Sequence, residues 1–146
     1  MFDTGYTREQ VAELLSAMLT VAPDRDDEHR PARHFATALR DHLFKMPDLD
    51  LDKLPYSTPE GFTEIFLDED QRRQSLQLLI IMPYLSGKLH DDDVQRVDLY
   101  ARTANLSPDS LQDLNNIVNG RIKKALILYG RRGAIEFTPG TPVQKL

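Results

Sequence analysis

The segment from Leu76 to Met82 reads LQLLIIM and contains the longest apolar run of the chain. In a helix, these side chains point in nearly every direction, and a helix without a polar face belongs in the interior of a bundle. Pro83 follows directly and ends or kinks the helix, because proline removes a backbone hydrogen bond. A transmembrane helix needs about 20 apolar residues, so this run is too short to cross a bilayer. We therefore predict that it forms the central helix around which the others pack.

Capping residues and apolar spacing predict the other helices. A Thr7/Gln10 capping box starts one helix at residues 8–21. Pro31 suits a first helical turn and starts a second helix, which runs to about residue 45. Further helices are predicted to start at Thr58–Pro59, after the capping residue Asp68, at Asp91 and at Ser107–Pro108, the last of them continuing toward Gly130 unless Gly120 breaks it.

These elements predict an all-α fold, a single compact bundle of six or seven helices, because strand signals are scarce. A chain of 146 residues fits one domain. We expect the bundle to occupy residues 1–133. Residues 134–146 contain two prolines and a glycine, and we expect them to form an extended tail. The sequence contains no cysteine, which excludes disulfides, cysteine-ligated metals and thiol nucleophiles. The first residues show no basic and apolar leader pattern, so we expect no secretory signal and a cytoplasmic protein.

Charge is unevenly distributed along the chain. Eight acidic residues and one lysine lie between Met46 and Asp70, whereas the stretch from Arg121 to Arg132 holds five basic residues and no acidic one. The net charge of −5 disfavours binding to nucleic acid or to an anionic membrane surface. The two stretches are either solvated faces of opposite sign or a docking surface for a protein partner or a second copy. The candidate partner-binding residues are Arg121, Lys123, Lys124, Arg131 and Arg132.

One cluster of acidic residues is a candidate metal site. Asp91, Asp92 and Asp93 follow His90, and carboxylates beside an imidazole can hold a divalent cation such as Ca²⁺, Mg²⁺ or Mn²⁺. The helix dipole offers an alternative explanation, because acidic residues in a first helical turn are stabilising without any metal. No cofactor other than such a cation is indicated.

The sequence lacks the motifs of the common catalytic sites. It contains no HExxH, GxSxG, GxGxxG or P-loop sequence. The alternating aspartates at 48, 50 and 52 do not continue as a calcium loop, because Lys53 and Pro59 stand where such a loop needs Gly and Glu. His34 and His42 lie beside the apolar side of their predicted helix, where we expect partly exposed histidines rather than ligands.

The region from Leu76 to Leu114 resembles a TerB-like domain of the tellurite-resistance family. The shared features are an apolar helix, a turn at Gly87, an acidic helix start and a Ser107–Pro108 cap. Ser86 stands where the family has Asp, and Asp93 where it has Glu. The resemblance implies a compact helical bundle with an accessory role in stress-response or membrane-associated assemblies. It also implies a link to metal binding, since the family's acidic residues are suspected ligands.

Two functions follow as hypotheses from the sequence. The first is a non-enzymatic, TerB-like interaction module that docks a protein partner or associates with itself. The second is a metal-binding or sensing domain that uses the cluster at residues 90–93. An exposed apolar patch would favour the first, and its candidate members are Tyr100, Tyr129, Ile135 and Phe137.

Overall fold

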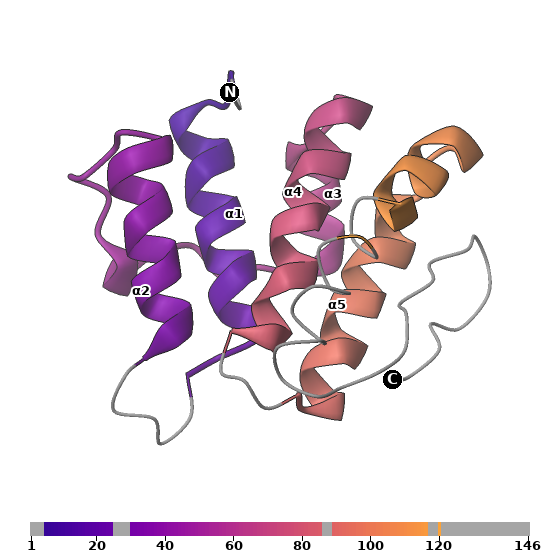
Figure 1. Ribbon diagram of the computed structural model, residues 1–146. Coiled ribbons are helices and arrows are strands. Elements are labelled where there is room, and N and C mark those ends of the chain that lie inside the picture. The colour runs from indigo at the N-terminus through magenta and orange to yellow at the C-terminus, as the bar shows by residue number, and fades with distance from the viewer. Residues whose placement is uncertain (1–4, 25–29, 86–88, 117–119, 121–146) are drawn as a thin grey trace.

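The computed structural model describes residues 5–24, 30–85, 89–116 and 120, and Figure 1 shows them as a compact bundle of helices. No strand occurs in these ranges, so the predicted all-α class is confirmed. Residues 108–116 form a further helical run after α5. The elements with defined bounds are α1 (Arg8–Val21), α2 (Pro31–Ala38), the π-turn η1 (Leu39–Leu43), the 3₁₀ turn η2 (Leu51–Lys53), α3 (Pro59–Ile65), α4 (Glu69–Ile81), the 3₁₀ turn η3 (Met82–Tyr84) and α5 (Asp91–Ala104).

Capping bonds confirm the predicted starts of α1, α4 and the helical run 108–116. At α1 the Thr7 hydroxyl accepts from the Gln10 amide while the Gln10 side chain accepts from the Thr7 amide, which completes the capping box. Asp68 accepts from the Gln71 amide at α4. The hydroxyl of Ser107 accepts from the Ser110 amide at the start of the helical run 108–116. Sequence alone located these ends because each cap is a local interaction.

The second helix ends earlier than predicted. Regular α-helix stops at Ala38, and the chain continues through η1 to Leu43 instead of reaching Lys45. Lys45 then takes a left-handed backbone with φ +54°, which ends the helical path two residues before Pro47. The wider turn aims the Arg40 guanidinium at the carbonyl of Leu49, which holds the following loop against the helix.

The central helix of the bundle is α1, which corrects the prediction that α4 would be enclosed. Figure 1 places α1 between α2 on one side and α4 on the other, and α3 and α5 also pack against it. Every residue from Glu13 to Met18 is buried. In α4 the side chains of Leu76, Leu79 and Ile80 are buried, but Leu78 and Ile81 are only partly so. Most of the apolar run therefore lies in the core, and Leu78 and Ile81 lie at its edge.

A row of aromatic rings fills the core beneath α1. The ring of Tyr6 stacks on Phe44, with centroids 5.8 Å apart, and meets Phe66 edge-on at 5.2 Å. Phe66 in turn contacts Phe62, whose ring packs edge-on against Tyr100 at 5.5 Å. Such pairs stabilise a core beyond the area they bury. The row connects the N-terminal end of α1 to the middle of α5.

Two arginines tie the C-terminal ends of helices to their neighbours. Arg72 of α4 donates to the carbonyls of Thr63 and Phe66 at the end of α3, and to Ala104 at the end of α5. Arg96 of α5 donates to the carbonyl of Val21 at the end of α1. Free carbonyls at helix ends carry partial negative charge, so cationic donors satisfy and stabilise them. The predicted tail at 134–146 lies outside the described residues.

Candidate functional site

Two apolar ridges of partly buried side chains lie on the helices that flank α1. On α2 and η1, Phe35, Leu39 and Leu43 recur at i, i+4 and i+8 and are partly buried. On α4 and the turn after it, Leu78, Ile81 and Leu85 recur at i, i+3 and i+7 and are also partly buried. These spacings put each set on one side of its helix. We call the six residues together the α2–α4 face.

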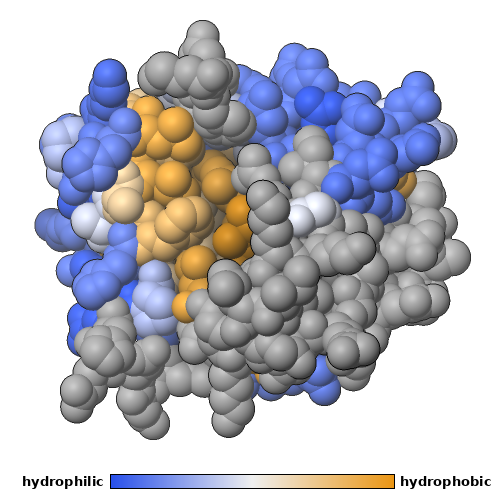
Figure 2. All heavy atoms as spheres, in the orientation of Figure 1, coloured by the Kyte–Doolittle hydropathy of each residue, from blue (hydrophilic) through white to orange (hydrophobic). Residues whose placement is uncertain are grey.

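Figure 2 shows an apolar area on the side of the molecule where α2, α1 and α4 lie next to one another, with hydrophilic residues around part of its edge. All six side chains except Ile81 pack against the core, and all six stay partly accessible to solvent. Contiguous apolar surface with a polar edge is typical of protein interaction sites. Tyr100, which we had considered for such a patch, is instead buried; Tyr129, Ile135 and Phe137 lie outside the described residues.

The predicted metal cluster has a structural arrangement of its own. Asp91 and Asp92 are exposed, whereas Asp93 is buried and pairs with the Arg96 guanidinium at 2.6 Å. His90 precedes the helix at its N-cap position, without a side-chain capping bond. In the part of the chain that the structure covers, no three His, Asp or Glu side chains come together as a metal-binding group. The divalent-cation site stays a prediction from sequence.

Several carboxylates of the acidic stretch at residues 46–70 form ion pairs or hydrogen bonds within the fold. Asp48 pairs with Arg8 at 3.0 Å, and Asp52 with Arg33 at the same distance. Hydrogen bonds from Ser107 hold the pKa of the Glu69 carboxyl below its usual value. The basic residues Arg121, Lys123, Lys124, Arg131 and Arg132, the predicted partner-binding set, all lie outside the described residues.

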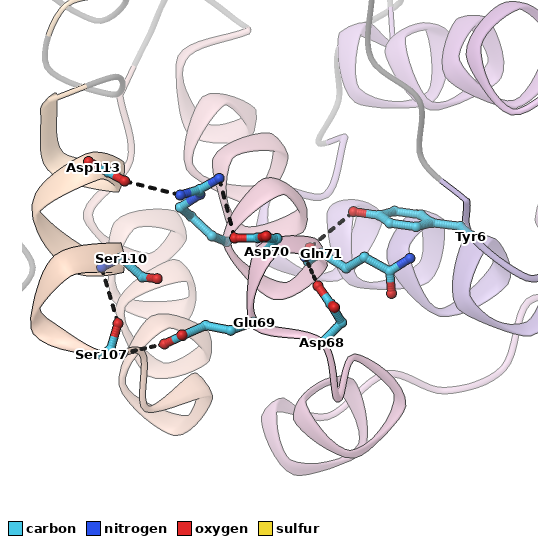
Figure 3. Close-up of polar contacts among 9 residues, drawn as sticks. Tyr6, Asp68, Glu69, Asp70, Gln71, Ser107, Ser110 and Asp113 are labelled. Atoms are coloured by element: carbon cyan, nitrogen blue, oxygen red, sulfur yellow. Dashed lines mark hydrogen bonds and ion pairs between the residues drawn. The ribbon is translucent and has the colours of Figure 1, made fainter.

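Figure 3 shows how α4 joins the helical run 108–116. Glu69 accepts from the Ser107 amide at 2.6 Å. Along the same seam, the guanidinium of Arg73 lies between Asp70 of its own helix and Asp113, with an N–O distance of 3.2 Å to the latter. Tyr6 reaches α4 from the other side, where its hydroxyl donates to the carbonyl of Gln71. These polar groups act as connectors between helices.

A buried polar cluster was missed by the sequence analysis. Glu13 of α1 is only 4% exposed, and its Oε2 atom has no hydrogen-bond partner among the described residues. The Ser57 hydroxyl bonds the Glu13 side chain and lies 2.7 Å from the Tyr100 hydroxyl. Burial raises the pKa of Glu13, partly offset by Ser57. Burial also raises the pKa of Tyr100, and the nearby Glu13 carboxylate adds to this effect.

The signal that could have found this cluster is the polar stripe of α1. Glu13, Ser16 and Thr20 recur at i, i+3 and i+7 on a helix that is otherwise apolar from Val11 to Val21. Such a stripe normally faces water. Here the segment before α3 covers it, because the Ser16 hydroxyl donates to the carbonyl of Pro55 and the neighbouring Ser57 bonds Glu13.

Comparison with known proteins identifies no relative: no family model matches the chain, and no match was found among curated proteins or solved structures. Within the described ranges, no helix has both the length and the apolar character needed to span a membrane. His34 and His42 are exposed and stand apart from the buried cluster. Two features of the described residues stand out: the partly buried apolar side chains of the α2–α4 face and the buried carboxyl group of Glu13.

Proposed function

We propose that this chain is a non-enzymatic docking module whose α2–α4 face binds an amphipathic helix of a protein partner. The observation that carries the proposal is the pair of apolar ridges, one on α2 and η1, the other on α4. An amphipathic helix presents apolar side chains at i, i+3, i+4 and i+7, and it binds best between two ridges that offer the same periodicity.

The TerB-like resemblance and the proposed compartment belong to the same proposal. The helical order from α4 through α5 to the Ser107 cap agrees with the order of features on which the resemblance was based. The absence of cysteine suits a reducing compartment, in which we place the module. The net charge of −5 supports a protein partner over nucleic acid.

The test uses a pair of matched double variants. Leu39→Glu with Leu78→Glu places one carboxylate on each ridge, and Leu67→Glu with Leu99→Glu makes the same chemical change at leucines that are 79% and 55% exposed elsewhere. The purified wild-type chain is used to isolate and identify its partner from its source cells. Binding of that partner is then measured by calorimetry. We expect the ridge variant to lose at least about tenfold in affinity, because a carboxylate cannot be buried at an apolar contact cheaply.

The control variant should bind the partner as the wild type does. Circular dichroism and the melting temperature establish that both variants are folded. Equal affinity of the wild type and the ridge variant would contradict the proposal. Sedimentation of the chain alone tests the other occupant: a concentration-dependent dimer that the ridge variant abolishes would show that a second copy covers the face.

A further inference from the structure

The carboxyl group of Glu13 occupies a position that ordinary packing does not explain. It lies where α1 meets α3 and the segment that precedes α3. A Cβ atom added at Gly61 of α3 would lie 3.6 Å from its Oε1 atom, so the backbone of α3 passes close to the carboxyl group. A buried carboxylate without a cation is costly, whereas the neutral acid is tolerated.

Burial favours the protonated form of Glu13, and the Ser57 hydrogen bond partly offsets this effect. The segment before α3 contributes Ser57 and Tyr56, α3 contributes Glu60, and α5 contributes Tyr100. Tyr56 and Glu60 are a phenol and a carboxyl group that raise the pKa of the Tyr100 phenol electrostatically. None of these four can supply a positive charge, since hydroxyls, phenols and carboxyls ionise to anions.

The guanidinium groups on the adjoining helices are engaged elsewhere. Arg72 of α4 donates to the three carbonyls at the ends of α3 and α5. Arg96 of α5 pairs with Asp93 and donates to the carbonyl of Val21. On α1 itself, Arg8 pairs with Asp48. Loss of the Glu13 proton would therefore leave a negative charge that these cations do not neutralise.

We propose that Glu13 is a proton-operated latch: its neutral form holds α3 and the segment before it against α1 and α5, and its ionised form loosens them. The ionised carboxylate gains hydration only when α3 moves away from α1. Opening is therefore coupled to the release of one proton. This inference does not depend on the docking function of the α2–α4 face.

The direction of the pH dependence follows from linkage. In the open state Glu13 is solvated and has the ordinary pKa of 4.5, whereas in the closed state burial raises its pKa. The closed state thus keeps its proton over a pH range in which the open state has lost it. Its stability is complete below pH 4.5 and declines as the pH rises toward the raised pKa, beyond which it is constant.

The test is amide hydrogen exchange of α3 as a function of pH, with protection factors corrected for intrinsic exchange. In the wild type we expect the protection of Gly61, Phe62 and their neighbours to fall about tenfold per pH unit within that range, since one proton is released on opening. Glu13→Gln should abolish the decline, because glutamine is neutral at every pH. A carbon-detected NMR titration of the Glu13 carboxyl gives its pKa directly and needs no variant.

Three outcomes would contradict the latch, and one control variant completes the test. A Glu13 carboxyl that titrates at or below 4.5 would overturn it, as would α3 protection that is independent of pH in the wild type. An equal decline in Glu13→Gln would assign the effect to another group. Glu60→Gln is the matched control: it removes the neighbouring carboxyl of α3 and should leave the decline in place. If Glu13→Gln does not fold, the wild-type carboxyl titration and the Glu60→Gln profile decide the matter together.

Discussion

The α2–α4 face and the Glu13 cluster break the usual division between core and surface in opposite ways. At the face, Leu78 and Ile81 leave apolar carbon partly accessible to solvent. At the cluster, a carboxyl group is only 4% exposed, and one of its oxygen atoms has no hydrogen-bond partner in the described part of the chain. Both arrangements lower the stability of the isolated chain, the first by hydrating apolar surface and the second by removing a carboxyl group from water.

The two regions differ in what would stabilise them: the apolar face lacks a covering surface, and the buried carboxyl group lacks a counter-charge among its described neighbours. An apolar face is completed by another surface, so it indicates recognition. A buried acid is completed by a proton, so it indicates sensitivity to pH. Local departures from consistency of this sort are expected at functional positions, where stability has been exchanged for activity.

Two phenylalanines test the comparison with the largest expected effect. Phe62 is fully buried next to the cluster, whereas Phe35 is partly buried on the face. Phe62→Ala should lower the free energy of unfolding by about 3–5 kcal/mol, since it removes core contacts and leaves a cavity. Phe35→Ala should cost about 1 kcal/mol, because its side chain is already partly hydrated. Urea denaturation measures both.

Equal losses for the two variants would mean that Phe35 belongs to the core and that the α2 ridge is not available for docking. Phe35→Leu serves as the control. It keeps the ridge apolar and should be nearly neutral, because a hydrophobic substitution at a partly buried site tolerates a change of volume.

Much of the fold follows from local sequence, and the two unusual regions do not. Thr7 and Asp68 mark helix starts because caps act over three residues. The stripe of Glu13 was not recognised as buried, because burial there depends on Ser57, which lies 44 residues further along the chain. Similarly, the apolar run at 78–82 gives no sign that two of its side chains stay at the surface, since that depends on which neighbours α4 finds. Long-range contacts decide both cases.

A second test concerns how α3 is held over the cluster. Arg72 satisfies three carbonyls at the ends of α3 and α5, whereas the neighbouring Arg73 makes salt bridges with the exposed carboxylates of Asp70 and Asp113. Arg72→Met should cost about 2–3 kcal/mol, because partly buried carbonyls lose a charged donor. Arg73→Met is the matched control and should cost about 1 kcal/mol or less. Thermal unfolding ranks the two, and a larger loss for Arg73→Met would refute the anchoring role of Arg72.

The smallest loss of stability is expected from a change at the start of α2, the helix that carries one ridge of the α2–α4 face. This helix has no side-chain cap from its own N-cap residue, Arg30, and Asp24 supplies one from a distance: its two carboxylate oxygens accept from the amides of Ala32 and Arg33 at 2.9 and 3.0 Å. Asp24→Ala should lower stability by about 1 kcal/mol, the usual cost of losing a cap. Asp24→Asn keeps one acceptor oxygen and should lose less.

Asp24→Ala also tests whether the α2–α4 face and the Glu13 cluster behave independently. Fraying of α2 disturbs the ridge that contains Phe35 but leaves Glu13 and α3 in place, since α2 packs on α1 through Ala32 and Ala36. Asp24→Ala should therefore speed amide exchange in α2 and weaken partner binding while the pH profile of α3 stays unchanged. A shift of the α3 profile in this variant would show that the α2–α4 face and the Glu13 cluster are coupled, so that proton binding at Glu13 and docking at the face depend on one conformational equilibrium.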